Sequence, residues 1–527
     1  MDDSRRNFLK TTACGLTGAA MIGSLGMFSE VDAMVQQQPE VASDYKALVC
    51  IFLNGGSDCN NMVIPYDDYT VTGGGTTNGY DNVRTGSGLA IPKSALANTK
   101  ITPSNASGVS YALHPNLSPE FGTVPGQAKG LMDIWTAGKL AVLCNVGSLV
   151  QPITRANYIA NIGRPYQLFS HSDQVAQQQT SVAKTLGQTG WGGRIADKTN
   201  SLNGTVALPM NISLAGTNLF STGINSRQLA IASAPTTLAN LLVLNWNGTN
   251  SSNPNCTGPG VPLAACLGPS SYRTLLGFDQ NVTLIKGAAD TTSQALTADA
   301  ALNQGEPAIP SPGNPTVFPN TSLGNQLKQI AKLIKIKDAA GITMKRQIFF
   351  CSVGGFDTHT NETGSDPANP GGQATQAGTQ GGLMTQISQA MRAFYDEMVA
   401  QGLSNNVTTF TLSDFGRTLQ PSGSGTGTVG TDHAWGSHSF IMGGAVLGGQ
   451  FYGSRRPDNT GLPYGYPAMQ LGGPDDTNSN RGQWIPTTAI DQYAATLANW
   501  YGLDPLDRAS VFPNLFKFAT PNLGFLG

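Results

Sequence analysis

Four short runs of apolar residues, each bounded by glycine or polar residues, dominate the hydrophobic pattern of the chain. A continuous apolar run of this length predicts a strand buried on both faces, as in a parallel sheet. Longer segments with apolar residues three and four positions apart predict helices that flank such a sheet. The predicted strands are 46–53, 140–146, 347–353 and 407–412, and the predicted helices are 127–137, 323–335, 381–401 and 488–502.

The order of these elements favours one large α/β domain with a central, mainly parallel sheet flanked by helices. Between about residue 200 and residue 322 the composition changes. Asn, Thr, Ser, Gly and Pro dominate there, and a single helix is predicted near 289–303. We expect this stretch to form a cap inserted into the domain, not an independent domain.

The first residues carry an export signal. Residues 4–10 read SRRNFLK, the SRRxFLK pattern of a twin-arginine signal, and a weakly apolar segment follows at 11–28. Small residues near 31–33 predict cleavage there, so 1–33 would be the signal peptide and 34–527 the mature α/β domain. The apolar segment is too short and too rich in Gly, Ala and Thr to favour a membrane anchor. We expect the chain to use the twin-arginine export machinery and to be periplasmic or secreted.

Composition narrows the classes of partner. Charged residues make up 12% of the 527 residues and the net charge is −2, so there is no basic face for nucleic acid. No other segment is apolar and long enough to predict a stable membrane span. The chain has seven cysteines; Cys256 and Cys266 lie in one loop rich in Pro and Gly, where an oxidising compartment could pair them.

Histidine is scarce, and its distribution indicates a functional site. Three of the five histidines lie between residues 351 and 439, namely His359, His433 and His438. They lie near aspartates, two of which, Asp357 and Asp414, follow closely after predicted strands. Ligands of α/β sheets bind beyond the carboxyl ends of the strands. Carboxylates and imidazoles gathered there predict a metal site, although any one of them could instead cap a turn or a helix.

Two further segments add candidates. Asp58 follows the first predicted strand after a glycine turn, where it could contact a ligand or form an Asx-turn. Residues 170–174 (SHSDQ) bring a hydroxyl, an imidazole and a carboxylate together. They could supply a nucleophile or a metal ligand, or only cap a helix. Arg194, in the WGGR segment, is a cation that would suit an oxyanion beside a metal.

The order of the motifs resembles a known family. After the SRRxFLK leader come FLNGGSDCNNMVIP, LHPNL, LMDIWTAGKLAVLCNVG, SHSDQ, GWGGRIAD, GGFDTH, SDFGRT, TDHAWGSHSFIMGG and QYAATLANWYG. Over nearly the whole mature chain this resembles the twin-arginine-exported domain-of-unknown-function family 1501. That family is grouped with the alkaline-phosphatase-like fold, which includes sulfatases and cofactor-independent phosphoglycerate mutases. The resemblance implies this fold and a metal-dependent hydrolase of phosphate or sulfate esters.

The resemblance also implies roles for individual residues. In that superfamily a metal-binding aspartate ends the first strand, and a later Asp/His pair binds one metal. A strand-ending SDHG motif supplies an aspartate and a histidine to the second metal. The implied metal ligands are Asp58, Asp357, His359, Asp414 and His433. Phe415 replaces the histidine of SDHG. Residues 432–438 are expected to form a loop in which His433 binds metal and His438 lies behind it.

The implied reaction assigns the remaining candidates. A divalent ion (Zn, Mn, Ca or Mg) would polarise an oxyanion and activate a hydroxyl or a water. Ser172 is the candidate nucleophile, His438 a ligand or general acid, and Arg194 or Arg417 an oxyanion clamp. The substrate would be a small-molecule or glycan ester. The alternative is a non-catalytic exported protein that binds glycans or an envelope partner on the same scaffold, and Phe415 is its main support.

Overall fold

A computed structural model describes residue 42 and residues 44–527, with gaps. The gaps are 74, 119–129, 239–240, 242–244, 247–260, 263–282, 303–304, 315, 365–378 and 423–428. The predicted signal peptide and the Cys256–Cys266 pair lie outside the described residues. Asp44–Gly527 forms one compact unit. Among the helices of the described residues, none combines the length and the apolar character needed to cross a membrane.

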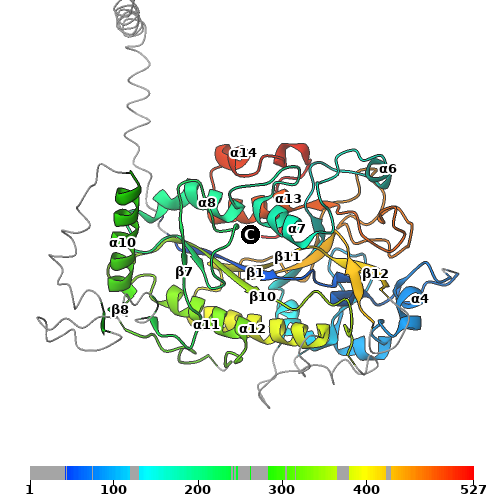
Figure 1. Ribbon diagram of the computed structural model, residues 1–527. Coiled ribbons are helices and arrows are strands. Elements are labelled where there is room, and N and C mark those ends of the chain that lie inside the picture. Colours follow the sequence, from blue (N-terminus) through cyan, green and yellow to red (C-terminus); the bar gives the residue numbers. More distant parts are fainter. Residues whose placement is uncertain are drawn as a thin grey trace, which may run out of the picture. The chain divides into compact units, whose positions relative to one another are not determined.

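A nine-stranded sheet runs through this unit in the order β15-β5-β14-β11-β1-β10-β6-β7, with β16 beside β5 (Figure 1). Its strands are β1 (Lys46–Leu53), β5 (Leu140–Gly147), β6 (Asn211–Ser213), β7 (Gln228–Ala230), β10 (Arg346–Val353), β11 (Val407–Ser413), β14 (Ser437–Met442), β15 (Phe451–Tyr452) and β16 (Thr488–Ala489). All neighbouring pairs are parallel except those that β14 makes with β11 and β5. The sheet is therefore mainly parallel, as the sequence predicts.

Continuous burial explains why the sequence predicted the long strands. Every residue of β1 after Lys46 is buried, and β5 and β11 are buried along their whole length. A strand covered on both faces has no reason to alternate apolar and polar side chains. The apolar runs therefore predicted β1, β5, β10 and β11 to within one residue at each end.

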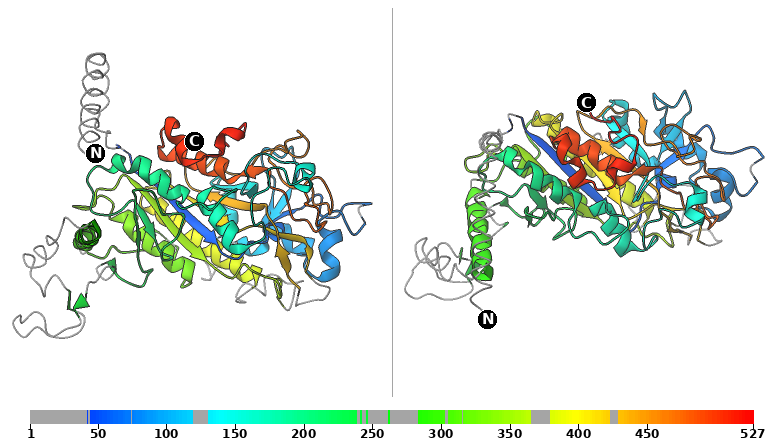
Figure 2. Two further views of the ribbon diagram at one scale, coloured as in Figure 1. Left: turned by 45° about the horizontal axis from the view of Figure 1, so that its top comes forward. Right: turned by 90° about the horizontal axis from the view of Figure 1, so that it is seen from above.

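Helices cover both faces of the sheet (Figures 1 and 2). One face carries α11 (Ser322–Lys335) and α12 (Gln380–Ala400), and the other carries α7 (His171–Thr180), α8 (Trp191–Thr199) and α13 (Ile490–Tyr501). The remaining α-helices of the described residues are α3 (Cys59–Met62), α4 (Tyr80–Arg84), α5 (Leu131–Thr136), α6 (Arg155–Ile159), α10 (Thr283–Leu302) and α14 (Arg508–Val511). Smaller sheets pair β2 (Val63–Pro65), β4 (Tyr111–Leu113) and β3 (Lys100–Ile101), β12 (Arg417–Pro421) with β13 (Thr431–His433), and β8 (Asn245–Trp246) with β9 (Val261–Pro262).

The stretch predicted as a cap contributes to the sheet itself. β6 pairs in parallel with β10, and β7 pairs in parallel with β6, so residues 211–230 extend the main sheet at one edge. Both strands are only three residues long and carry polar side chains. Such short segments have no periodicity that would separate them from a loop in the sequence.

The three central strands end at the same level. Leu53 of β1 pairs with Val353 of β10 and with Ser413 of β11. β14 runs in the opposite direction and begins at this edge, because Ser437 pairs with Val146 near the end of β5. The segments that follow β1, β10 and β11 therefore meet the segment that precedes β14, at the edge where α/β sheets bind ligands.

Candidate metal centre

Three imidazoles and one carboxylate meet at this edge. Asp357 and His359 follow β10, His433 ends β13, and His171 begins α7. The ligand atoms of His171, Asp357 and His433 all lie within 4.8 Å of one another. His359 joins them, because its Nε2 lies 3.1 Å from Asp357 Oδ1 and 2.9 Å from His433 Nε2. We call these four residues the His/Asp cluster.

A backbone carbonyl holds His433 from behind. Its Nδ1 lies 2.8 Å from the carbonyl oxygen of Phe169. A carbonyl oxygen only accepts hydrogen bonds, so Nδ1 must carry a proton. Burial lowers the pKa of His433, which favours the neutral ring with a lone pair on Nε2. That Nε2 faces Asp357 Oδ1 at 3.2 Å.

Carboxylates hold the other two rings in the same manner. His171 Nδ1 lies 2.7 Å from Asp414 Oδ2, and His359 Nδ1 lies 3.1 Å from Asp432 Oδ1. In a neutral ring, donation from Nδ1 leaves Nε2 as an acceptor. His171 Nε2 is buried, makes no hydrogen bond and lies 3.5 Å from Asp357 Oδ2. Histidines that bind metals are commonly anchored in this way, with the second ring nitrogen on a carboxylate or a carbonyl oxygen.

The arrangement fits a bound cation. Nε2 of His359 and Nε2 of His433 are 2.9 Å apart, and in the neutral Nδ1–H form neither ring has a proton to place between them. Two lone pairs and a carboxylate oxygen at such distances repel one another unless a positive charge lies among them. Ligand atoms around one zinc ion, at about 2.0–2.1 Å from it, lie about 3.3 Å apart. The separations of 2.9–3.5 Å within the cluster are close to this value.

Arg417 supports the cluster from the interior. It is wholly buried, and its Nη1 donates to Asp357 Oδ1 at 2.7 Å and to the carbonyl oxygen of Gly55 at 3.2 Å. Its other donors reach Thr431 Oγ1 and the Thr431 carbonyl oxygen. Partial burial opposes the ionisation of Asp357, but the hydrogen bond and the charge of Arg417 outweigh it and lower the pKa. Arg417 therefore orients Asp357, which differs from the oxyanion clamp that the sequence suggested.

Two glycines let the loops come this close. Gly55 has a φ of +115° and Gly56 a φ of +83°, a region that glycine adopts readily and other residues rarely. A Cβ on Gly55 would lie 2.3 Å from the backbone nitrogen of Asp357, and one on Gly56 would lie 2.4 Å from the ring of Phe415. The amide of Gly55 also donates to Asp414 Oδ1 at 3.1 Å. The glycine turn after β1 thus positions the loops of β10 and β11.

Phe415 closes the inner side of the cluster. Its ring is wholly buried, with centroids 4.8 Å from His171 and 4.6 Å from His433. The two imidazoles lie 4.4 Å apart and nearly perpendicular. Phe415 therefore packs against two of the three rings of the cluster. Among the described residues, one group of His, Cys, Asp and Glu side chains is compact enough to hold a metal. It consists of His171, Asp357 and His433.

The segment that carries most of the cluster matches a known family. Residues 341–461 match the family described as "Protein of unknown function (DUF1501)". The DUF1501 segment contains Asp357, His359 and His433, whereas His171 lies outside it. The match agrees with the resemblance seen in the motifs over that part of the chain.

Other comparisons add little. No curated protein matches the chain at a significant level. One similar solved structure is described as Ps i-CgsB in complex with k-i-k-neocarrahexaose, at 8% identity, with 91% of this chain and 78% of that chain covered and a TM-score of 0.29. Another is the PsFucS1 sulfatase from Pseudoalteromonas sp., at 10% identity, with 80% and 66% covered and a TM-score of 0.25. TM-scores of this size establish no common fold, and neither protein's activity is transferred to this chain.

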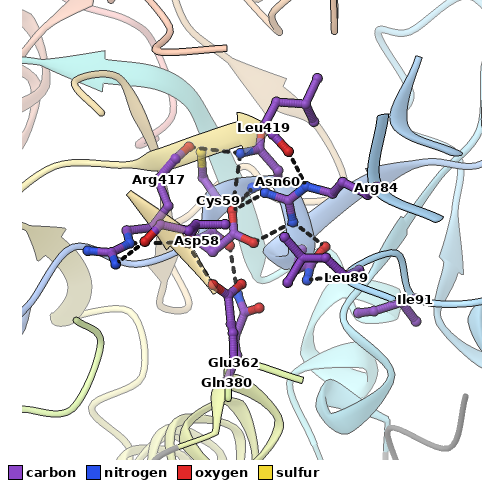
Figure 3. A network of polar contacts seen from close by, with 12 residues as sticks. Asp58, Cys59, Asn60, Arg84, Leu89, Ile91, Glu362, Gln380, Arg417 and Leu419 are labelled. Atoms are coloured by element: carbon purple, nitrogen blue, oxygen red, sulfur yellow. Dashed lines mark hydrogen bonds and ion pairs between the residues drawn. The ribbon is translucent and has the colours of Figure 1, made fainter. Parts of the chain in front are cut away.

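Asp58 lies outside the His/Asp cluster, although the sequence suggested it as a ligand. Its carboxylate contacts Arg84 through two oxygens, at 2.6 and 3.1 Å, and both side chains are wholly buried (Figure 3). It also accepts the backbone N–H of Asn60 as the N-cap of α3. Burial opposes its ionisation, but the charge of Arg84 outweighs this and lowers the pKa of Asp58. The turn-capping alternative therefore describes its local structure.

Glu362 links this buried pair to the DUF1501 segment. Its Oε2 accepts from Thr431 Oγ1 at 2.6 Å and from Thr358 Oγ1 at 3.0 Å. Burial, reinforced by the charge of Asp58, raises the pKa of Glu362, which favours its protonated form. Because Thr431 also contacts Arg417, this buried network continues to the guanidinium that orients Asp357.

His438 belongs to the fold, not to the cluster. It lies in β14, where its Nδ1 accepts the N–H of Asn145 at 3.1 Å and its ring stacks on Tyr466 at 5.1 Å. Burial lowers the pKa of His438 to about 3. The ring is therefore neutral at neutral pH, which does not suit the general acid suggested by the sequence.

The remaining two candidates make no described contact with the cluster. Arg194 donates to the backbone carbonyl oxygens of Thr180, Thr189 and Val511, and burial lowers its pKa to about 10. It therefore ties α8 to its neighbours and is not placed as an oxyanion clamp. Ser172 is exposed, and its hydroxyl lies 3.2 Å from Ser170 Oγ and 3.3 Å from Asp173 Oδ2.

The SHSDQ segment does reach the cluster, but through His171 and not through Ser172. His171 is one of only two histidines outside the stretch from 351 to 439, and this scarcity was the available signal. Its partner Asp414 lies 243 residues further along the chain. Asp432 was visible beside His433 in the sequence, but its contact with His359 joins residues that are 73 positions apart in the chain.

Proposed function

We propose that the His/Asp cluster binds a divalent metal ion and that the protein is an exported metal-dependent hydrolase of phosphate or sulfate esters. The main observation behind this proposal is that Nε2 of His359 and Nε2 of His433 lie 2.9 Å apart. Asp357 Oδ1 lies 3.1 Å from the first and 3.2 Å from the second. When bound, such an ion would polarise an ester oxyanion and lower the pKa of a water nucleophile. The ester class is taken from the motif resemblance to the alkaline-phosphatase-like superfamily.

The donor set favours zinc among the four candidate ions. Imidazole nitrogen suits zinc, whereas calcium, magnesium and manganese prefer ligand sets made of oxygen. His171, His359 and His433 each direct Nε2 towards Asp357, so nitrogen outnumbers oxygen among the proposed ligands. Asp414 and Asp432 are proposed to hold the rings instead of binding the ion.

The exposure of the cluster supports a catalytic site. The side chains of Asp357 and His359 are 46% and 43% exposed, whereas Phe415 and Asp414 close the inner side. Structural metal sites are closed by protein ligands, and catalytic sites keep a position for water or substrate. We place such a position on the exposed outer side of this cluster.

The residues around the cluster would fix its geometry before a substrate arrives. Asp414 holds His171, the Phe169 carbonyl holds His433, and Arg417 holds Asp357. Groups fixed in this way need little reorganisation during a reaction, which is how enzymes gain from orientation. No described contact places a hydroxyl side chain against the Nε2 atoms, so water is the proposed nucleophile.

Metal analysis and ester hydrolysis of the purified protein test this proposal. We expect close to one equivalent of zinc per chain and hydrolysis of a nitrophenyl phosphate or sulfate. Asp357→Asn should lose both, whereas Asp458→Asn should keep both. Asp458 is a matched control, since its side chain is 43% exposed and lies outside the cluster. Wild-type protein that binds no transition metal after equilibration with zinc and manganese would contradict the proposal.

The non-catalytic alternative rests on Phe415, which leaves the described residues with one compact metal-ligand group. A protein that binds metal through Asp357 but hydrolyses neither ester, and is retained on an immobilised glycan, would favour this alternative. We also propose periplasmic or secreted localisation through the twin-arginine machinery, on the motif at residues 4–10.

A further inference from the structure

We propose that Gln174 is a positioning residue for His433 and acts through the backbone of Phe169. The inference rests on the proposed metal site, but it concerns how the chain prepares one ring of the cluster. Gln174 Oε1 accepts the N–H of Phe169 at 2.5 Å. The carbonyl oxygen of the same Phe169 accepts from His433 Nδ1 at 2.8 Å.

The backbone of Phe169 needs such support. Its φ is +70°, in the left-handed region that a residue with a side chain rarely adopts. A residue stays in this region only where its surroundings hold it there. If the hydrogen bond from Gln174 were lost, Phe169 would be free to rotate towards a negative φ. Its carbonyl oxygen would then turn away from His433 Nδ1.

The position of Gln174 on α7 supports this role. It lies three residues after His171, so both side chains lie on the same face of the helix. Gln174 is wholly buried, and its Nε2 makes no hydrogen bond. A buried donor without a partner is unfavourable, so the Nε2 group does not explain a glutamine at this position. The hydrogen bond that Oε1 accepts does explain it. One turn of α7 thus supplies one ring directly and orients a second through Phe169.

A neighbouring glutamine provides a matched control. Gln179 lies on the same helix and is buried, and its Oε1 accepts the backbone N–H of Phe220 at 3.0 Å. It therefore does for Phe220 what Gln174 does for Phe169, but Phe220 has no described contact with the cluster. Gln179→Met measures the general effect of replacing a buried glutamine of α7.

The test measures the tautomer of His433 in metal-free protein with ¹⁵N-labelled histidine. The chain has five histidines, so each signal can be assigned by replacing one histidine at a time. We expect wild type to show His433 protonated on Nδ1 alone. Gln174→Met should show a mixture of tautomers and a zinc Kd raised about tenfold, at the lower end of the range for residues that orient ligands. Gln179→Met should resemble wild type.

Two variants separate positioning from folding. Gln174→Glu keeps an acceptor for the Phe169 N–H and should restore the single tautomer. Phe169→Gly combined with Gln174→Met should also recover it in part, because glycine adopts a positive φ without support. If Gln174→Met does not fold, Gln174→Asn, which is shorter by one methylene, gives the same comparison.

An unchanged His433 tautomer in the Gln174 variant would overturn the inference, and so would an equal change in Gln179→Met. The tautomer is read without metal, so this outcome does not depend on the proposed function. Absence of zinc binding by wild type would instead contradict the metal site and leave the role of Gln174 to be decided by the spectra.

Discussion

Arg417 Nη1 lies 2.7 Å from Asp357 Oδ1, and this contact joins a wholly buried cation to a carboxylate that is 46% exposed. The negative charge of Asp357 balances the charge of Arg417, whether or not a metal is present. The same carboxylate faces three imidazole Nε2 atoms. Stability and the proposed metal binding therefore depend on the same carboxylate.

Arg417→Lys should weaken both properties. Lysine keeps the charge, but its single nitrogen cannot reach Asp357, Gly55 and Thr431 at once. We expect the free energy of unfolding to fall by about 2–4 kcal/mol and the zinc Kd to rise about 10–100-fold. Urea denaturation and zinc titration measure the two effects. The exposed Arg455→Lys serves as control, and an unchanged Kd in Arg417→Lys would contradict the orienting role.

Gly55→Ala should disturb the cluster more than a left-handed glycine elsewhere. Its Cβ would lie 2.3 Å from the backbone nitrogen of Asp357. Gly402 has a φ of +70° with open space around it, so Gly402→Ala measures the cost of the backbone conformation alone. That cost is about 1–3 kcal/mol. We expect Gly55→Ala to lose more stability than this and to weaken zinc binding. Equal losses in the two variants, with zinc binding intact, would show that the contact with Asp357 does not matter.

Asp58→Asn separates the ligand suggested by the sequence from the ion pair seen in the structure. Removal of this charge leaves Arg84 buried without its carboxylate partner, which should cost about 3–5 kcal/mol. The folded fraction should still bind metal, because Asp58 lies outside the cluster. Unfolding curves and metal content of the folded protein are the measurements. A stable Asp58→Asn protein without metal would return Asp58 to the ligand set.

Asp491 should make stability fall as the pH rises. Burial raises the pKa of this carboxyl from 3.8 to about 7. The folded state therefore favours the protonated form, so the full stability is present below about pH 4 and is lost as the pH rises through about 7. The loss amounts to as much as about 4 kcal/mol. Asn cannot ionise, so Asp491→Asn should gain stability over wild type at pH 8 and not at pH 4.

Urea denaturation at several pH values measures this difference. The exposed Asp68→Asn is the control and should follow wild type at every pH. A constant gap between Asp491→Asn and wild type from pH 4 to pH 8 would contradict the prediction.

Export should depend on Arg5 and Arg6. The twin-arginine receptor reads this pair as an address, so replacement of both by Lys should leave uncleaved precursor in the cytoplasm. Immunoblots of cytoplasmic, periplasmic and secreted fractions detect it. Lys10→Arg, which leaves the pair intact, should be processed normally. Normal processing of the double variant would show that another signal is used.

The sequence predicted the elements that continuous burial determines and missed those that distant pairing determines. The β1 run KALVCIFL is apolar because both faces of the strand are covered, and its bounds were predicted correctly. Residues 432–438 were expected to form a loop, but β14 begins at Ser437 and continues to Met442. Its strand character comes from pairing with β11 and β5, and the contact of His438 with Asn145 spans 293 residues.

In the site, too, the sequence indicated residues with a local pattern and missed contacts between distant segments. Asp357, His359 and His433 were visible because scarce histidines lie near strand ends in one stretch of the chain. Asp414 was suggested as a ligand, whereas the structure places its Oδ2 behind His171. Asp58 was suggested as a ligand, whereas the structure pairs its carboxylate with Arg84 at the end of α4, a contact that the sequence does not reveal.

The place of β14 in the sheet also sets an order of events during synthesis. β5 emerges from the ribosome early, but its three neighbours in the sheet, β14, β15 and β16, all lie after residue 436. A nascent chain that stops short of this point leaves β5 without a partner strand, and contacts between such distant segments form slowly. His433 arrives in the same late portion of the chain. The cluster lacks one of its rings until His433 has been made, so a nascent chain that ends before this residue lacks the complete set of proposed ligands.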